Sequence, residues 1–374
     1  MQNIRLTQLD GLRGLFSLMV ILFHFPTENE FAGIHATSNF MVRQGDLFVD
    51  FFFVLSGFVI SLNYENKINS YSSFSNYISQ RFLRLYPLLF YSVIVFLAFE
   101  LCFNVFLPQF VSNPDSVANL LLQTLNTLLF LNSTPVFGGM PGMNFPSWSI
   151  SSEMISYIVF GLALLIFSKQ KKIALGFILL VSALFLITIN SYMETYVWGF
   201  VRGLICFITG YYTFQAYKRY HTMTLNAIWE YTVPIFLIII FYLRFHHLDR
   251  NEIYTLFVIP PFFGIAVFIY ALSNGYLVKL MSGKVFQYLG KISYSMYLNH
   301  AIVMVIVTKA VFNVLKVPVT QITVSAILLL YIAAVIVYSH GTYIFIEKKG
   351  RTLLQSVYPF KKRIVPSPEV HHKA

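Results

Sequence analysis

Long apolar runs recur from one end of this chain to the other and constrain its fold more than any other feature. Each run holds about 20 residues, the length that a helix needs to cross the roughly 30 Å hydrocarbon layer of a bilayer. Of the 374 residues, 57% are hydrophobic and 11% are charged, whereas soluble domains carry roughly 25% charged residues. A water-soluble protein of this composition would lack the polar side chains to cover its surface. The sequence therefore predicts an all-α, polytopic transmembrane helical bundle.

The apolar runs divide the chain into ten predicted spans. They cover residues 9–26, 46–64, 84–107, 147–167, 172–190, 196–216, 229–245, 253–272, 294–315 and 321–346. The stretch 117–131 is apolar but short and rich in Asn and Thr, which favours a re-entrant or surface helix. We expect residues 1–347 to form one transmembrane domain with no soluble domain appended. Residues 348–374 are expected to be a basic, disordered cytoplasmic tail.

The distribution of positive charge predicts the orientation of the spans. If the N-terminus is cytoplasmic, 20 of the 26 Lys and Arg fall in cytoplasmic segments, in keeping with the positive-inside rule. An even number of spans then returns the C-terminus to the same side. We therefore expect a multi-pass protein of the inner (plasma) membrane with both termini cytoplasmic. The net charge of +11 reflects this topology, and we expect no nucleic-acid partner.

The first span carries Asp10, Arg13 and His24, and ionisable groups inside spans are costly enough to be functional candidates. Arg13 and His24 are eleven residues apart, which places them on one helix face, roughly 16 Å apart along the axis. An arginine can bind a phosphate, and a histidine can act as a general base or as a nucleophile that carries an acyl group. Alternatively, Asp10 and Arg13 are a topology signal at the membrane interface and His24 caps a helix end. The spacing favours neither interpretation.

Charged side chains also stand near the ends of the second and third spans. Arg81 and Arg84 are three residues apart and share a helix face, so they could bind a phosphate or only anchor the cytoplasmic start of the third span. Asp50 needs a partner once it is buried, and an arginine or a histidine would serve. Ser56 and Gly57, further along the second span, are more typical of close helix packing.

Two later spans begin with polar side chains. At the start of the fourth span, Ser149 fits a helix N-terminus, whereas capping explains Glu153, one turn further on, less well. In the ninth span, Tyr294, Tyr297 and His300 repeat every three residues and form one polar stripe. Aromatic stripes usually anchor helices at the membrane interface, but a histidine within the stripe also suggests a function.

Taken together, these segments resemble the acyltransferase 3 family of membrane O-acyltransferases. The matching stretches are LDGLRG…HF at 9–25, DLFVDFFFVLSGFVI at 46–60, RFLRLYP at 81–87, PSWSISSE at 146–153 and LGKISYSMYLNH at 289–300. The resemblance implies about ten helices and transfer of an acyl group from cytoplasmic acyl-CoA, expected to be acetyl-CoA, to a sugar hydroxyl. The acceptor would be a cell-surface polysaccharide or its lipid-linked precursor, and the membrane lipid is the other expected partner. No metal is expected.

Roles follow from the family's motifs and from the candidates above. We expect the catalytic residues to be His24, Arg13 and Glu153, the donor-binding residues to be Arg13, Arg81 and Arg84, and the substrate-binding residues to be Asp50, Trp148, Ser149, Tyr297 and His300. The chain departs from the family in two places. Asn299 stands where a tryptophan is common, and Glu347 is followed by two lysines where the family often has Glu-x-Pro.

Two other classes of protein are compatible with these residues. A polysaccharide or lipid-linked sugar exporter could line its conduit with Arg13 and His24. A proton-coupled transporter of small solutes could use His24 and Asp50. Many transporters have two similar halves, and no such repeat is visible in this sequence, so the enzyme is the preferred hypothesis.

Overall fold

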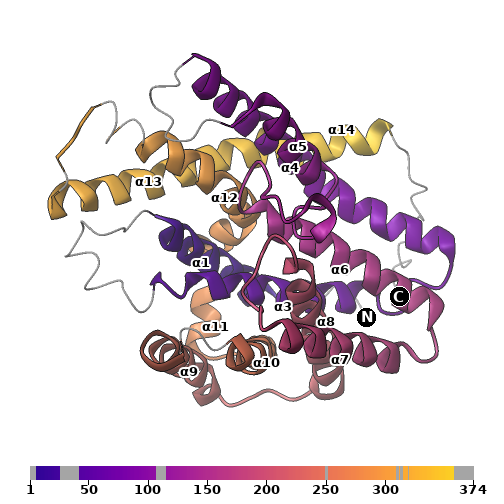
Figure 1. The fold of residues 1–374 in the computed structure, drawn as a ribbon. Helices are drawn as coiled ribbons and strands as arrows, with labels where there is room; N and C mark the ends of the chain where they lie inside the picture. Colours follow the sequence, from indigo (N-terminus) through magenta and orange to yellow (C-terminus); the bar gives the residue numbers. More distant parts are fainter. Residues whose placement is uncertain are drawn as a thin grey trace, which may run out of the picture.

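The computed structural model describes residues 6–25, 42–106, 115–248, 252–308, 311, 315–318 and 320–357, and helices dominate this part of the chain (Figure 1). The α-helices are α1 (Thr7–His24), α3 (Phe48–Tyr64), α4 (Tyr71–Phe106), α5 (Val117–Leu128), α6 (Ser147–Ile166), α7 (Lys171–Ile189), α8 (Gly199–Tyr220), α9 (Ile228–Leu243), α10 (Glu252–Leu272), α11 (Tyr276–Met281), α12 (Lys284–Thr308), α13 (Gln321–Thr342) and α14 (Lys349–Val357). The shorter elements are the 3₁₀ turns η1 (Gly45–Leu47) and η3 (Pro135–Phe137) and the π-helical turns η4 (Arg244–Leu248) and η6 (Tyr343–Lys348). The predicted all-α class is confirmed.

A helix lies at each of the ten predicted spans, and several helices are long and apolar enough to cross a membrane. Seven stretches of the described residues meet that standard: 45–64, 71–104, 147–166, 171–189, 228–246, 252–272 and 321–356. The helices α1, α8 and α12 do not appear among them because they carry more polar side chains. The structure thus confirms a multi-pass helical membrane protein, and the span count of ten stays a prediction.

The more polar helices lie inside the bundle, where they pack against its most buried members. The most extensive contacts join α3 to α8 and α1 to α12. Glycines allow both approaches: a Cβ atom at Gly57 would overlap the carbonyl of Phe207, and one at Gly14 would meet the backbone of Gly290. The predicted packing role of Gly57 is therefore confirmed. By contrast, only 17% of the apolar stretch of α7 is buried, and its remaining surface suits contact with lipid.

Two helices begin earlier than the apolar runs indicated. α4 starts at Tyr71 and runs for 36 residues with Pro87 inside it, whereas the predicted span starts at residue 84. Arg81 and Arg84 therefore lie within a long helix and not at its start. α12 likewise starts at Lys284, ten residues before the predicted span. The reason is that helical structure continues through polar residues, which a search for apolar runs leaves out.

The short apolar stretch 117–131 forms α5, whose 12 residues extend about 18 Å, too short to cross a bilayer. One of its faces, which includes Leu121 and Leu125, is exposed, and the opposite face, which includes Thr124, is buried. This agrees with the predicted surface or re-entrant helix.

The C-terminal tail differs in part from the expectation of disorder. The basic stretch Lys349–Val357 forms helix α14, which packs against α4. Apolar side chains such as Leu353 and Leu354 are spaced among its charges, and this pattern supports a helix with two unlike faces. Residues 358–374 lie outside the described residues.

A buried carboxylate ties three helices together just beyond the end of α3. Glu65 accepts hydrogen bonds from Gln215 Nε2 at 2.7 Å and Lys218 Nζ at 2.9 Å, and Lys171 Nζ lies 3.6 Å away. Burial by itself raises the pKa of Glu65, but these hydrogen bonds and positive charges outweigh it and lower the pKa below its ordinary value. The stabilisation is therefore fully present above the unfolded-state pKa of about 4.3 and is lost as the pH falls through the lower folded-state pKa.

We expect Glu65→Gln to lower the free energy of unfolding by about 1–3 kcal/mol at neutral pH, because a charged hydrogen-bond acceptor is lost. The difference from wild type should shrink as the pH falls below about 4, where the wild-type carboxylate also takes up a proton. Unfolding of the purified protein in detergent, followed at pH 7 and pH 3, measures both values. Lys67→Gln, an exposed change two residues away, is the control. Equal differences at the two pH values would contradict the expectation.

Candidate active site

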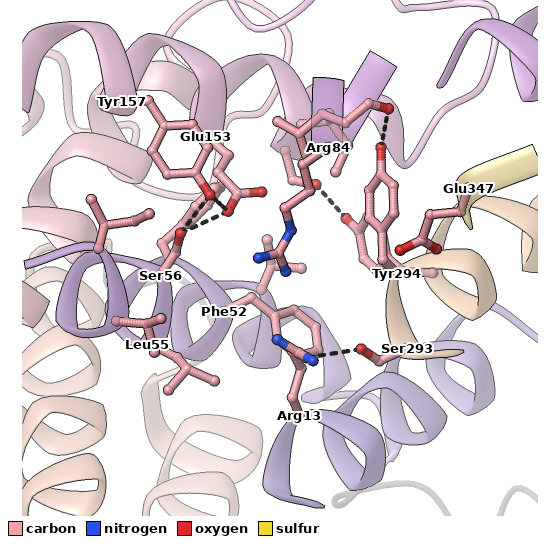
Figure 2. A pocket seen from close by; sticks show the side chains of 18 of the residues that line it. Arg13, Phe52, Leu55, Ser56, Arg84, Glu153, Tyr157, Ser293, Tyr294 and Glu347 are labelled. Atoms are coloured by element: carbon pink, nitrogen blue, oxygen red, sulfur yellow. Dashed lines mark hydrogen bonds between the residues drawn. The ribbon is translucent and has the colours of Figure 1, made fainter. Parts of the chain in front are cut away.

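A cavity of about 120 Å³ lies between α1, α3, α4, α6, α12 and η6. It gathers five of the ten site residues predicted from sequence. These are Arg13, Arg84, Ser149, Glu153 and Tyr297. They come from four helices that are far apart in the chain, so their convergence is a property of the fold. Figure 2 shows the guanidinium groups of Arg13 and Arg84 facing one another across this space.

Arg13 is held firmly by its neighbours on α12. Its Nε donates to Ser293 Oγ at 3.0 Å and its Nη2 donates to the Gly290 carbonyl at 2.8 Å. The same Nη2 lies 3.3 Å from a carboxylate oxygen of Asp10, one turn earlier on α1. Asp10 and Arg13 therefore form an ion pair within α1. These contacts fix the direction of the guanidinium, which lines the cavity.

Arg84 is the less constrained of the two guanidinium groups. It makes no hydrogen bond or ion pair with any other described residue, although it lines the cavity and interacts electrostatically with Glu153 and Glu347 on either side. A guanidinium carries five N–H donors in a planar fork that matches carboxylate and phosphate oxygens. Arg84 is therefore free to bind an anion in the cavity.

Glu153 forms hydrogen bonds with two polar side chains, neither of which was predicted from the sequence to belong to the site. Ser56 Oγ donates to Glu153 Oε1 at 2.7 Å, and the Tyr157 hydroxyl donates to the same oxygen. Ser56 had been assigned to packing, but it lines the cavity, as Tyr157 does. The two residues could have been noticed because Ser56 is a polar group within an apolar span and Tyr157 stands one turn after Glu153. Nearby, Ser149 Oγ donates to the Tyr297 hydroxyl at 2.8 Å.

Glu347 also lines the cavity, and sequence reasoning had noted it only as a departure from the family pattern. It comes from η6 and accepts a hydrogen bond from Ser295 Oγ at 2.8 Å. The Tyr294 hydroxyl, beside it in Figure 2, donates to the Leu85 carbonyl at 2.7 Å and so joins α12 to α4. A carboxylate at the end of a long apolar run was the signal that could have identified Glu347.

His24 and His300 form a pair next to the cavity but do not line it. Their ring centroids are 4.9 Å apart, and Tyr297, which does line the cavity, is 5.9 Å from His300. His24 Nδ1 lies 2.9 Å from the Val20 carbonyl and His300 Nδ1 lies 2.6 Å from the Tyr297 carbonyl. Because a carbonyl can only accept, each Nδ1 carries the proton, and in the neutral ring each Nε2 is an acceptor.

One nitrogen of this pair is a buried acceptor that the described residues leave unused. His300 Nε2 is buried and has no hydrogen-bond partner among the described residues. Phe145 packs against both rings, at 4.9 Å from His24 and 5.7 Å from His300. An unpaired buried acceptor is costly, so a hydroxyl group that donates to His300 Nε2 would satisfy it. The predicted polar stripe of the ninth span therefore meets the histidine of the first.

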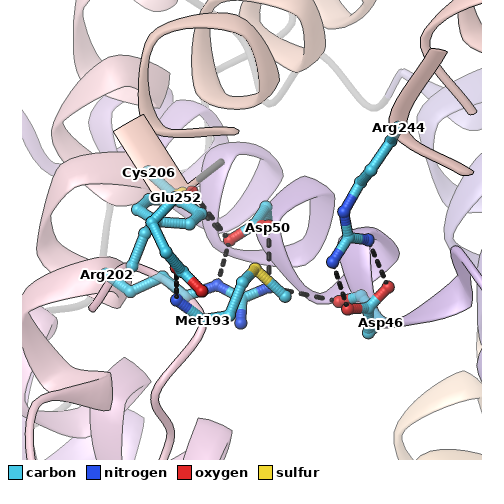
Figure 3. A network of polar contacts seen from close by, with 8 residues as sticks. Asp46, Asp50, Met193, Arg202, Cys206, Arg244 and Glu252 are labelled. Atoms are coloured by element: carbon cyan, nitrogen blue, oxygen red, sulfur yellow. Dashed lines mark hydrogen bonds and ion pairs between the residues drawn. The ribbon is translucent and has the colours of Figure 1, made fainter. Parts of the chain in front are cut away.

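Asp50 and Trp148 do not line the cavity. Asp50 instead belongs to a buried ion pair with Arg202 (Figure 3). Asp50 accepts from Arg202 Nε at 2.7 Å and from Arg202 Nη2 at 2.8 Å. Tyr192 and Cys206 donate to the same carboxylate. The Trp148 ring stacks against the Arg202 guanidinium at 5.5 Å. The expected arginine partner of Asp50 is therefore Arg202, and these groups hold α3, α6 and α8 together.

Arg81 stands one turn before Arg84, outside the lining of the cavity. Its Nη2 donates to the Tyr64 hydroxyl at 3.1 Å, and its guanidinium lies over the Tyr64 ring at 5.2 Å. Its Nε is buried without a hydrogen-bond partner among the described residues. Of the three arginines that were expected to bind the donor, Arg13 and Arg84 line the cavity and Arg81 lies next to Arg84 on α4.

A family model matches this chain over most of its length, and two known proteins each match 42% of it. Residues 6–338 match the acyltransferase domain of the acyltransferase 3 family. Over 161 residues, 42% of this chain, it is 30% identical to acyltransferase MdmB of Streptomyces mycarofaciens, of which the match spans 39%. Over 163 residues it is 28% identical to protein 2 in the picA locus of Rhizobium radiobacter, of which the match spans 81%. No solved structure matches. With a family match over nearly the whole chain, this helical membrane protein belongs to the acyltransferase 3 family.

Proposed function

We propose that this protein is an O-acyltransferase that moves an acyl group, most simply acetyl, from cytoplasmic acyl-CoA to a sugar hydroxyl. The acceptor is a cell-surface polysaccharide or its lipid-linked precursor. One observation carries the proposal: Arg13 and Arg84 face one cavity, and Tyr297 of that cavity also contacts the His24–His300 pair. The arrangement supports an anion site and a base at two ends of one substrate path.

The arginine end suits the phosphates of a CoA thioester. Arg84 has free donors and Arg81 lies one helical turn away on α4, so two guanidinium groups are available for phosphate oxygens. Arg13 and His24 are roughly 16 Å apart along α1. A long pantetheine arm joins the phosphates of CoA to its thioester, and such a donor suits binding groups and reacting groups that are far apart.

The histidine end suits attack by a hydroxyl group. We assign His24 as the general base: its Nε2 takes the proton of the acceptor hydroxyl while that oxygen attacks the thioester carbonyl carbon. The C–S bond then breaks, and the departing CoA thiolate recovers the proton from His24. His300 and Tyr297 hold the acceptor beside His24, with Ser149 supporting the tyrosine. Glu153, held by Ser56 and Tyr157, interacts electrostatically with Arg84 and belongs to the arginine end of the cavity.

The orientation follows from the positive-inside rule. Both termini face the cytoplasm of the inner (plasma) membrane, and the arginine end of the cavity faces the cytoplasmic pool of donor. The acceptor reaches the histidine end from the outer half of the membrane. The order of groups along α1 supports this direction, because Arg13 precedes His24 by about three turns.

Transfer of labelled acetyl from acetyl-CoA to the glycan fraction of membrane vesicles tests the proposal. Vesicles that contain the protein should label a lipid-linked or polysaccharide product, and vesicles without it should not. An exporter without chemistry would move glycan across the membrane and leave it unlabelled, an outcome that would exclude the enzyme assignment.

In the same assay we expect Arg84→Gln to raise KM for acetyl-CoA at least about tenfold, because one charged hydrogen-bond donor to phosphate is worth roughly 1.5–3 kcal/mol. Arg84→Lys should recover part of the loss, since it keeps the charge without the fork. Arg219→Gln, an arginine at the exposed end of α8, is the matched control. An unchanged KM for Arg84→Gln would remove Arg84 from the donor site.

A further inference from the structure

The segment that follows the family domain packs beside the arginine end of the cavity. The match to the family ends at residue 338, before η6 and α14 begin. α14 packs against α4, and Gly350 lies so close to α4 that a Cβ atom there would stand 3.0 Å from Pro87 Cβ. Pro87 is three residues, just under one turn, beyond Arg84. The C-terminal segment is thus held next to the donor-binding arginines.

The π-helical turn η6 brings this segment into the site. Glu347 of η6 lines the cavity, and Lys291, another lining residue, lies with its Nζ 5.4 Å above the Tyr343 ring at the start of the turn. Because a π-helix closes its hydrogen bonds over one more residue than an α-helix, it changes the direction in which later side chains point. Such turns are frequent at functional sites.

Arg351 follows Glu347 by four residues and adds a further positive charge. It interacts electrostatically with Arg84 and Arg81, both cations, and with Glu347. Its side chain is exposed, four residues beyond Glu347, which lines the cavity. A cation held near two others is unfavourable unless an anion compensates them.

Carboxylates do not balance the positive charge at this end. The cations of the described residues here are Arg13, Arg81, Arg84, Lys291 and Arg351, and the carboxylates are Asp10, Glu153 and Glu347. Arg81 is nine-tenths buried, and its Nε has no hydrogen-bond partner in the part of the chain that the structure describes. The surplus of positive charge, together with this orphaned donor, fits a ligand that carries more than one negative charge.

We propose that Arg351 is a phosphate ligand of the donor site, so that the C-terminal segment is a working part of the active site. The inference rests on the proposed acyl-CoA donor. Arg351 follows Gly350, which contacts Pro87 of α4, and it interacts electrostatically with Arg81 and Arg84, whereas the reacting end of the donor lies towards His24. Arg351 therefore contacts the nucleotide end of CoA and contributes to affinity for the donor, not to the chemical step.

Binding of free CoA and of pantetheine, which has no phosphate, tests this role without turnover. The probe is thermal stabilisation of the purified, full-length protein in detergent, titrated with each compound. Arg351→Gln should raise the apparent Kd for CoA about tenfold and leave that for pantetheine unchanged. Arg351→Lys should recover part of the affinity. Lys349→Gln removes an equal charge from the same helix, where Lys349 lies over the Phe345 ring at 4.6 Å, and should behave like wild type.

Each outcome supports or overturns the proposal. If wild type binds CoA and Arg351→Gln binds it equally well, Arg351 is not a ligand, while the proposed donor stands. If Arg351→Gln weakens pantetheine and CoA alike, its role is structural and the inference fails. If wild type binds no CoA, the proposed donor itself is wrong, and the inference falls with it. If Lys349→Gln loses as much CoA affinity as Arg351→Gln, the loss is a general effect of charge and the proposed contact of Arg351 with phosphate is wrong.

Discussion

His24→Ala is expected to lower the rate of acyl transfer by about 10²–10⁴-fold, the contribution of a positioned general base. The His24 ring lies 4.9 Å from the His300 ring, whose Nε2 has no hydrogen-bond partner among the described residues, and the Nδ1 of His24 is fixed by the Val20 carbonyl. Removing the imidazole takes away the proton acceptor but none of the donor-binding arginines. We therefore expect kcat to fall while CoA still stabilises the purified protein. Transfer of labelled acetyl at saturating acetyl-CoA measures the first effect.

The control for this variant is His221→Ala, a histidine in the exposed stretch after α8, which should keep full activity. His24→Ala with normal activity at normal expression would remove His24 from the mechanism. Incubation of wild type with labelled acetyl-CoA and no acceptor separates the two possible roles of the histidine. We expect no label on the protein, because the proposed base transfers only a proton. Label that stays on wild type and is lost in His24→Ala would instead identify an acyl-histidine intermediate.

The sequence predicted the parts of this site that depend on local spacing. Arg13 and Glu153, which the sequence marked as charged groups within spans, both line one cavity. Such convergence was foreseeable because each group is costly in a membrane unless it faces the interior. The pairing of His24 with His300 could not be derived from spacing, since it joins residues 276 positions apart through the packing of α1 on α12.

Glu347 and Arg351 show why the remainder of the site was missed. Their position depends on a π-helical turn and on the contact of Gly350 with α4. Apolar periodicity reports neither feature, because it detects faces of regular helices. The charge-rich composition after residue 347 instead favoured disorder. The packing of α14 on a distant helix outweighs that local preference.

Asp50 was predicted to bind substrate, but its surroundings indicate that it stabilises the fold. The carboxylate is fully buried, and both of its oxygens accept from Arg202, which is itself 1% exposed. A proton-coupled transporter would need this group to exchange protons with water, and the ion pair encloses it. We expect Asp50→Asn and Arg202→Met each to destabilise the protein by about 3–5 kcal/mol, because each leaves one buried charge without its partner. Thermal unfolding in detergent measures the loss.

The double variant Asp50→Leu with Arg202→Met distinguishes stability from substrate binding. It removes both charges, so it should recover a large part of the stability that either single change loses. Recovery will be incomplete, because Tyr192 and Cys206 lose the oxygen to which they donate. The folded fraction of each variant should keep the wild-type KM for acceptor, since the pair lies outside the cavity. If Asp50→Asn is as stable as wild type but has a raised KM, Asp50 binds substrate as the sequence predicted, and the Asp50–Arg202 pair is part of the acceptor site.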